Sequence, residues 1–423
     1  MVSGSSASVG GRRHCVAIVQ SRLPSRGSSR RRRRGFRSWC AALTCLLVAT
    51  VAVPLSEASA GVVVPANFVS RNGAQLRLGG VPFRFTGVNI YNANSNGLCR
   101  YSMSGSSLGA SLTAIGSGNR VIRSFFFQQL AITNGARDWT AFDRTFATAK
   151  AHGVKVIATL IDQWGNCGSM AAGGFKDASW YASGYKQRDP VGLVSYRDFV
   201  REIVTRYRDN PTILAWQLVN EPEAGDCSVV PEPTAHALLK SFAADVSGLV
   251  KAIDPHHLVS LGTIGTGQCG AQGADYKDVM SVPALDLCEY HDYQPHAMPG
   301  DQWNGLQVRL DQCNALHKPL IVGEVGIRPS DVGGTLAARA QVLAGKLATQ
   351  FRAGVAGELA WDWNVHGSTL GDFDIGPHDP ALSVLGHALP SLAAALPTVA
   401  AGSRRATLAW TPAAGHRSSP IRS

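Results

Sequence analysis

The chain of 423 residues lacks the usual signatures of zinc, redox and membrane-spanning proteins. None of its nine cysteines stands in a Cys-x-x-Cys spacing, which argues against a zinc site or a dithiol redox motif. Its N-terminal apolar run, from Trp39 to Pro54, is too short for a comfortable membrane span. We therefore expect no metal, no cofactor and no stable membrane association.

The body of the chain has no excess of positive charge, although the formal net charge of the whole chain is +11. Residues 1–60 hold ten arginines against one acid, and residues 397–423 hold four arginines and no acid. The segment between them, residues 61–396, has 26 basic and 28 acidic side chains. A body with this balance offers no positive field to phosphates, so nucleic acid is not an expected partner.

The arginine-rich head has the pattern of an export signal. Arginines 30–34 precede the apolar run, and Ala58-Ser59-Ala60 supplies small residues for cleavage. Arg33-Arg34-Gly35-Phe36 also resembles the twin-arginine export motif. We expect residues 1–60 to be a signal peptide and the protein to be secreted, with an uncleaved anchor as the alternative.

Six cysteines follow that segment, and an even number in an exported chain indicates structural disulfides. Fifteen pairings are possible for six cysteines. Cys288 ends an expected strand and Cys313 lies in the next helix, whereas Cys227 and Cys269 lie in loops after successive strands. We predict these two bridges, which leaves Cys99 with Cys167.

From about residue 68 the chain alternates between strand and helix patterns. The expected strands are residues 83–89, 121–127, 154–162, 213–220, 258–264, 285–290, 320–325 and 358–363. Helical spacing of apolar residues is clear at 139–152, 191–208 and 235–253. Eight alternations predict the α/β class and a (β/α)8 TIM barrel over residues 61–396, with a small hairpin near residues 71–80 over the barrel floor.

Two glutamates end expected strands, Glu221 in the fourth and Glu324 in the seventh. Parallel barrels build their sites at the carboxyl ends of the strands, and a carboxylate pair facing one site can cleave a glycosidic bond. A helix cap or a surface ion pair is the alternative for either residue alone. Asn220 and Pro222 favour a site, because the residue before proline is held in extended geometry.

These motifs resemble glycoside hydrolase family 5, of the retaining clan, from about residue 67 to 397. Asn220-Glu221-Pro222 matches the family's Asn-Glu-Pro motif, which implies that Glu221 is the general acid/base and that Asn220 binds the sugar 2-hydroxyl. Glu324 matches the nucleophile. The remaining matches are Arg123, which supports the nucleophile, His291 and Tyr293 of a His-x-Tyr motif, and Trp361, which floors the attacked sugar.

The chemistry of these roles requires particular protonation states. Arg123 and the Tyr293 hydroxyl favour the charged form of Glu324, as a nucleophile requires. Burial and a neighbouring carboxylate should raise the pKa of Glu221, so that it begins protonated.

Aromatic residues near strand ends are candidates for sugar stacking. We expect Trp164, Trp303, Trp361, Trp363 and Tyr91 to line the site, with Trp164 binding a sugar away from the cleaved bond. Trp216, in mid-strand, is expected to pack in the core.

The sequence motifs leave more than one polysaccharide substrate open. The motifs look most like the β-1,4-mannanase branch, yet Asp162-Gln163-Trp164 stands where that branch usually has Asn-Asn-Trp, and Phe125–Phe127 stands where it has a tryptophan. We expect a monomeric, secreted endo-β-glycanase acting on mannan or glucomannan. The alternatives are a cellulase or β-glucanase and a noncatalytic carbohydrate-binding barrel.

A metal-dependent hydrolase is disfavoured because potential ligands are poorly clustered. His256-His257 is expected in a solvated turn, and Asp372, Asp374 and Asp379 in a loop of caps rather than a calcium site. The C-terminal residues 397–423 resemble a fragment of a fibronectin type III module, which is too short to bury a core.

Overall fold

The computed structural model describes residues 63–95, 106–116, 120–165 and 175–388. The expected signal peptide, the C-terminal fragment, Cys99 and Cys167 lie outside these residues. Within the described part, no helix is both long and apolar enough to cross a bilayer.

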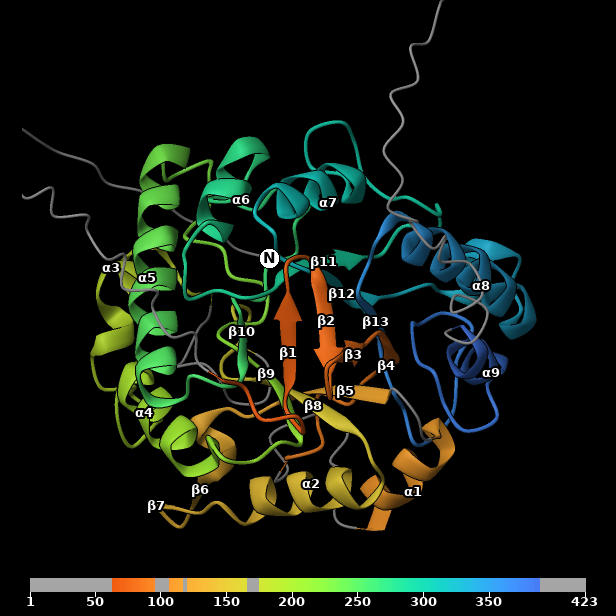
Figure 1. Ribbon diagram of the computed structural model, residues 1–423, viewed down its shortest axis with the longest axis horizontal. Coiled ribbons are helices and arrows are strands. Elements are labelled where there is room, and N and C mark those ends of the chain that lie inside the picture. The colour runs from red at the N-terminus through yellow and green to blue at the C-terminus, as the bar shows by residue number, and fades with distance from the viewer. Residues whose placement is uncertain (1–62, 96–105, 117–119, 166–174, 389–423) are drawn as a thin grey trace, which may run out of the picture. The chain divides into compact units, whose positions relative to one another are not determined.

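Eight parallel strands form the barrel at the centre of the fold (Figure 1). They are β4 (Phe85–Asn89), β5 (Arg120–Phe125), β8 (Lys155–Thr159), β9 (Ile213–Gln217), β10 (Leu258–Ser260), β11 (Cys288–Asp292), β12 (Leu320–Val325) and β13 (Gly357–Ala360). The hydrogen-bonded order runs β10-β9-β8-β5-β4-β13-β12-β11. A parallel bridge between Ser260 and Leu287 links the two ends. The predicted TIM barrel is confirmed.

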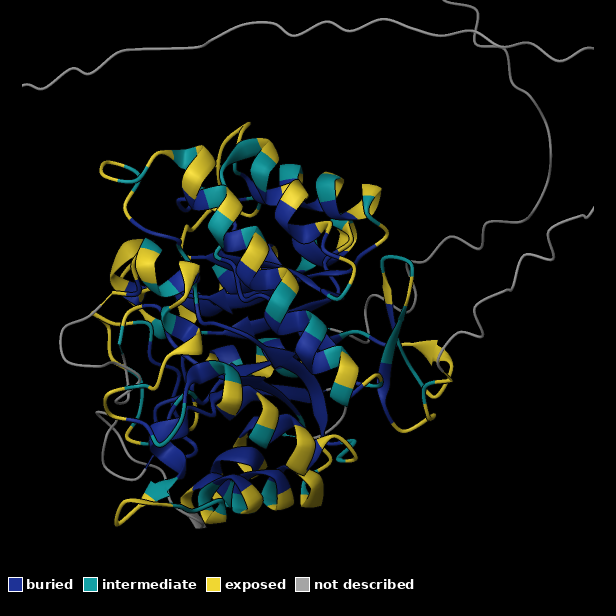
Figure 2. Ribbon diagram, turned by 90° about the vertical axis from the view of Figure 1, so that its left-hand side faces the viewer, coloured by how far each residue is buried: buried dark blue, intermediate teal, exposed yellow. Residues whose placement is uncertain are grey.

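Helices pack around the barrel and shield it from solvent. They are α1 (Ser106–Ile115), α2 (Thr140–Ala151), α3 (Ala178–Ala182), α4 (Tyr196–Tyr207), α5 (Glu232–Ile253), α6 (Gly273–Met280), α7 (Leu306–Ala315), α8 (Leu336–Ala353) and α9 (Pro380–His387). Figure 2 shows the barrel strands buried and the helices exposed on their outer faces. This pattern explains the continuous apolar runs of the strands, which are covered on both faces.

Helix α4 shows how the sequence builds this layer. The Ser195 side chain accepts a hydrogen bond from the Asp198 backbone and caps the helix start. Its buried residues recur at helical spacing and face the core: Tyr196, Phe199, Val200, Ile203, Val204 and Tyr207. The helix begins five residues later than predicted, because residues 191–195 form the loop that provides the cap.

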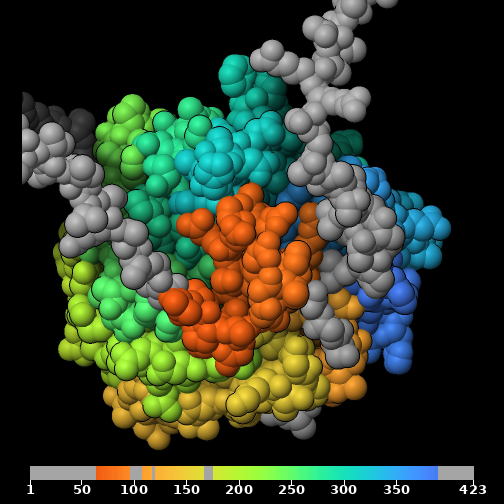
Figure 3. All heavy atoms as spheres, in the orientation of Figure 1, coloured from red at the N-terminus to blue at the C-terminus, as the bar shows by residue number. Residues whose placement is uncertain are grey.

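A hairpin covers the floor of the barrel, as predicted. Strands β1 (Val69–Asn72) and β2 (Gln75–Leu78) pair antiparallel, and Gly73 takes the left-handed conformation that the tight turn requires. Val69 and Leu76 belong to one buried cluster with interior residues of the barrel such as Ile321. Figure 3 shows this segment, in orange, lying over the end of the barrel that faces the viewer.

Three smaller expectations have mixed outcomes. Trp216 is fully buried, as predicted, and donates to Asp254. The prediction of a solvated turn at His256-His257 is wrong for His257, which is buried and bonded to Asp254 and to the Asn210 carbonyl. Asp379 caps α9, as expected of a cap-rich loop.

The two predicted disulfides within the described residues are present. Cys227 pairs with Cys269, and Cys288 pairs with Cys313. The first joins the loop after β9 to the loop after β10, and the second joins the start of β11 to α7.

Candidate active site

Glu221 and Glu324 meet at the carboxyl-terminal rim of the barrel. Glu324 is the second-last residue of β12, and Glu221 follows the end of β9 by four residues. One carboxylate oxygen of each residue and one ring nitrogen of His291 all lie within 4.8 Å of one another. The barrel therefore brings two glutamates that are 103 positions apart in the sequence into a single site.

The backbone at Glu221 is held in a rare conformation. Its φ of 57° is left-handed, so the extended geometry expected before Pro222 is wrong. For a residue other than glycine this conformation costs about 1–3 kcal/mol and is found preferentially at functional sites. The Glu221 amide donates to the Gly262 carbonyl at 2.9 Å. A β-carbon at Gly262 would lie 1.8 Å from the Val219 carbonyl oxygen. Glycine is therefore required for these two backbone segments to approach each other this closely.

Arg123, at the centre of β5, is fully buried and organises the nucleophile candidate. It donates to Glu324 Oε1 at 2.7 Å, to Asn89 Oδ1 at 2.9 Å and to Gln217 Oε1 at 2.8 Å. It also donates to the Asn220 side-chain oxygen. A buried guanidinium is tolerated because its donors are paired and one partner is a carboxylate.

His291 and Tyr293 complete the contacts of the two glutamates. The Tyr293 hydroxyl donates to Glu324 Oε2. Nδ1 of His291 lies 2.7 Å from Glu221 Oε1 and 3.5 Å from Glu324 Oε2. The register between β11 and β12 shifts between Tyr290 and His291, the kind of irregularity that re-aims side chains at barrel rims.

Asn220 is oriented through both ends of its amide. Its oxygen accepts from Arg123, and its nitrogen donates to Asp162 Oδ1 at 2.7 Å. Asp162 stands where an asparagine is usual in the mannanase branch, and the buried ammonium of Lys176 donates to its backbone carbonyl. The charge of Asp162 raises the pKa of Lys176, but burial has the larger effect and lowers that pKa to about 8.

The aromatic residues have different positions from one another. Trp361 is half-buried and stacks on Tyr91, with ring centroids 5.5 Å apart. Trp164 is 43% exposed, and its indole nitrogen donates to Glu221 Oε2 at 2.6 Å. Trp303 is exposed on the loop after β11. Trp363 is buried and bonded to Ser111, so its predicted place in the site lining is wrong.

A family model described as "GH family 5 beta-mannosidase-like" matches residues 143–296, which include Glu221 and His291. The chain is therefore similar to family 5 glycoside hydrolases, and the comparisons support a glycosidase.

Several similar proteins are endo-mannanases. Mannan endo-1,4-beta-mannosidase A of Podospora anserina is 29% identical over 278 residues, 60% of this chain and 67% of that protein. Mannan endo-1,4-beta-mannosidase F of Aspergillus clavatus is 28% identical over 223 residues, and the chain spans only about half (48%) of that protein's length. The solved endo-1,4-beta-mannanase of Rhizomucor miehei has a TM-score of 0.57 at 20% identity, covering 76% of this chain and 98% of its own, and supports the shared fold. These relatives and this solved structure are endo-β-1,4-mannanases, the branch that the sequence motifs resemble.

The raised pKa expected for Glu221 from the sequence is wrong. Burial raises the pKa of Glu221, but the hydrogen bond and the charge of His291 outweigh it and leave that pKa lowered. The pKa of Glu324 is raised, with burial as the largest cause. Burial lowers the pKa of His291, but the charge of Glu324 and the hydrogen bonds to Glu221 and Glu289 raise it to about 9. These shifts favour the imidazolium of His291 beside an ionised Glu221.

Three buried polar residues of this site are not identified by the sequence analysis. Asn89 and Gln217 contact Arg123, and Glu289 lies beside His291. Polar side chains inside otherwise apolar strand runs were the available signal, since a buried polar group needs a partner inside the fold.

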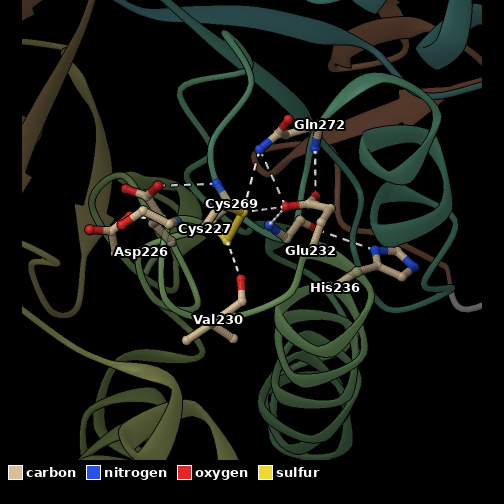
Figure 4. Close-up of a disulfide and its surroundings, with 10 residues drawn as sticks. Asp226, Cys227, Val230, Glu232, His236, Cys269 and Gln272 are labelled. Carbon is tan, nitrogen blue, oxygen red and sulfur yellow. Dashed lines mark hydrogen bonds between the residues drawn. A yellow bond between two sulfur atoms is a disulfide. The ribbon is translucent and has the colours of Figure 1, made fainter.

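The Cys227–Cys269 disulfide braces the loop that carries Glu221. Figure 4 shows Glu232 and Gln272 gathered around it. The Cys269 amide donates to Glu223 Oε1 at 3.1 Å, and the Ala224 amide donates to the Cys269 carbonyl. The segment just after Glu221 is therefore tied to the loop after β10.

Proposed function

We propose that this protein is a secreted, retaining endo-β-mannanase. The supporting observation is the close approach of Glu221 and Glu324, with one oxygen of each within 4.8 Å. Retaining glycosidases hold their carboxyl groups about 5–5.5 Å apart, whereas inverting enzymes need about 6.5–9.5 Å to admit a water. The similarity to mannan endo-1,4-beta-mannosidases supports mannan as the polysaccharide.

In the first step, Glu324 attacks the anomeric carbon and the bond to the leaving oxygen breaks. Glu221 protonates that oxygen, and a glycosyl ester forms on Glu324. Arg123 and Tyr293 hold the attacking carboxylate by hydrogen bonds to its two different oxygens. We assign the 2-hydroxyl to Asn220 and the floor under the attacked sugar to Trp361.

In the second step, Glu221 takes a proton from water, which attacks the anomeric carbon and releases Glu324. The charge of Glu324 is absent in the ester, and this favours the ionised form of Glu221 that the second step needs. Two displacements at one carbon return the original β configuration.

The proton required by Glu221 in the first step is already next to it. Nδ1 of His291 lies 2.7 Å from Glu221 Oε1, so a shift across one hydrogen bond converts the carboxylate to the acid. The sugar entering the site displaces water from both groups, and desolvation favours the neutral carboxyl and neutral imidazole over the ion pair.

We also propose a division of the chain into three parts. Residues 1–60 direct export, residues 61–396 form the catalytic barrel, and residues 397–423 are a tail that is not needed for catalysis.

Purified enzyme should be tested on mannan, glucomannan, carboxymethyl cellulose and laminarin. We expect mannan and glucomannan to be cut into oligosaccharides of mixed length, as read by chromatography, with the β-anomer appearing first by proton NMR. Preferred hydrolysis of carboxymethyl cellulose would instead assign the cellulase alternative. Initial release of the α-anomer would refute retention.

A further inference from the structure

Glu289 is a fully buried carboxylate one layer beneath the proposed catalytic pair. It lies on β11, two residues before His291, so both side chains point to the same face of the strand. Nε2 of His291 lies 3.5 Å from Glu289 Oε1. Among the described residues, this ring nitrogen has no partner that meets hydrogen-bond geometry, so Glu289 faces it as an ion-pair contact.

The surroundings of Glu289 keep it charged and fixed. Gln217 donates to Oε1 at 2.6 Å and to Oε2 at 2.7 Å, and the Ser260 hydroxyl donates to Oε2. Burial raises the pKa of Glu289, but the positive charges of His291 and Arg123 and the hydrogen bond from Ser260 outweigh it and leave that pKa lowered. A carboxylate with this many donors is held in its ionised form.

The backbone of β12 makes room for this pair. A β-carbon at Gly323 would lie 2.0 Å from Glu289 Oε1 and 3.0 Å from Nε2 of His291. Any other residue at position 323 would therefore displace the carboxylate from the imidazole. Gly323 directly precedes Glu324, so the same backbone also positions the nucleophile candidate.

We propose that Glu289 is a positioning residue for the acid step: it keeps a proton on Nε2 of His291, so that Nδ1 and Glu221 Oε1 share a second proton. This inference rests on the proposed function, because the shared proton is the one that Glu221 gives to the leaving oxygen. With Nε2 protonated, the ring either donates from Nδ1 to the Glu221 carboxylate or accepts there from the Glu221 acid. The interconversion moves one proton across a 2.7 Å contact and leaves the total charge unchanged.

The charges around His291 come from several strands. Glu289 lies on its own strand, Glu324 on β12 and Glu221 after β9, and all three favour the cation. Arg123 from β5 opposes it, and the Tyr293 hydroxyl is bonded to Glu324. Because Glu221 and Glu324 change charge during the reaction, Glu289 is the anion beside His291 whose charge stays constant.

The test is Glu289→Gln, which keeps the shape of the side chain and removes its charge. We expect the alkaline limb of the kcat/KM profile to move down by about one pH unit, because the imidazole loses its proton more easily, while the acidic limb stays in place. Glu289→Asp, which keeps the charge, should restore part of the shift. Glu358→Gln is the matched control, since Glu358 is a fully buried glutamate on β13 whose charged neighbours are Asp292 and Lys346.

Nitrogen-15 NMR of the histidines in the active protein tests the same inference without a mutation. Nε2 of His291 should remain protonated at pH 7 and above, and the Glu289→Gln variant should lose this proton at lower pH. An alkaline limb identical in wild type and folded Glu289→Gln, or an unprotonated Nε2 at pH 7, would overturn the inference. If wild type hydrolyses no β-glycan, the proposed function fails instead, and the NMR titration still decides the role of Glu289.

Discussion

Trp164 contacts the acid/base candidate directly, which changes its expected role. From the sequence it was expected to bind a sugar away from the cleaved bond, but its indole N–H lies 2.6 Å from Glu221 Oε2. Such a donor stabilises the ionised form of Glu221, which is the base of the second step. The ring itself is still exposed enough to meet a sugar, and it contacts Phe175 at a centroid distance of 5.4 Å.

We predict that Trp164→Phe lowers kcat about tenfold with little change in KM. A hydrogen bond to a charged group contributes about 1.5 kcal/mol or more, and phenylalanine keeps a stacking surface while removing the donor. Steady-state kinetics on mannan measure both constants. Trp303→Phe is the control, because Trp303 is also exposed but makes no hydrogen bond to either glutamate among the described residues. A normal kcat with a raised KM would instead show that Trp164 binds a sugar away from the cleaved bond.

Residue-scale roles differ in how far the sequence predicts them. The rim glutamates were predictable because each ends an apolar strand run of a recognisable barrel, and the structure brings them together with Arg123, Asn220, His291, Tyr293 and Trp164. Their protonation states were not, because these depend on whether His291 lies nearer Glu221 or Glu324, a difference between 2.7 and 3.5 Å. Trp164 is 57 residues from Glu221 in the sequence, and no local sequence pattern predicts their contact.

At the scale of elements, the sequence predicts the presence of the strands better than the residues at which they end. The predicted range 320–325 coincides with β12, whereas the predicted range 213–220 continues past the end of β9 at Gln217. Residues 218–220 lie beyond the regular ladder, although Leu218 and Val219 still donate to the Ser260 and Leu261 carbonyls and Asn220 forms an isolated bridge with Asp162. Periodicity detects a buried strand but not the point where it leaves the sheet.

The two described disulfides brace different ends of their elements, which gives a prediction. We expect the Cys227→Ser/Cys269→Ser pair and the Cys288→Ser/Cys313→Ser pair each to lower the free energy of unfolding by about 2–4 kcal/mol. The first pair alone should also lower kcat, because it frees the loop after Glu221, whereas Cys288 lies at the opposite end of β11 from the rim. Denaturant unfolding and kinetics below the melting range measure the two effects. Equal losses of kcat in both pairs would show that the loop is held by other contacts.

At the scale of the whole molecule, the basic excess and the residues proposed for catalysis lie in different segments of the chain. The basic excess lies in residues 1–60 and 397–423, and the barrel segment between them carries slightly more acids than bases. The barrel also contains all the residues proposed for catalysis. The fold class was predictable because eight strand–helix repeats leave few architectures open.

We predict that residues 61–396, produced alone, fold and hydrolyse mannan with the kcat/KM of the longer chain. The buried core and both described disulfides lie within this segment. Thermal unfolding and kinetics of the two forms provide the comparison. Loss of activity on removing 397–423 would mean that the tail contributes to the site.

Chemical rescue tests the central claim, that Glu324 is the nucleophile and Glu221 the acid/base. Glu324→Gly should be inactive on mannan but, given azide and an activated β-mannoside, should form the α-mannosyl azide, because azide replaces the missing carboxylate in a single displacement. Glu221→Ala with azide should form the β-mannosyl azide, since the Glu324 ester is still made and then displaced. NMR of the two azides reads the configuration directly. Near-normal turnover by Glu324→Gly, or the same azide anomer from both variants, would contradict the assignment of the two glutamates.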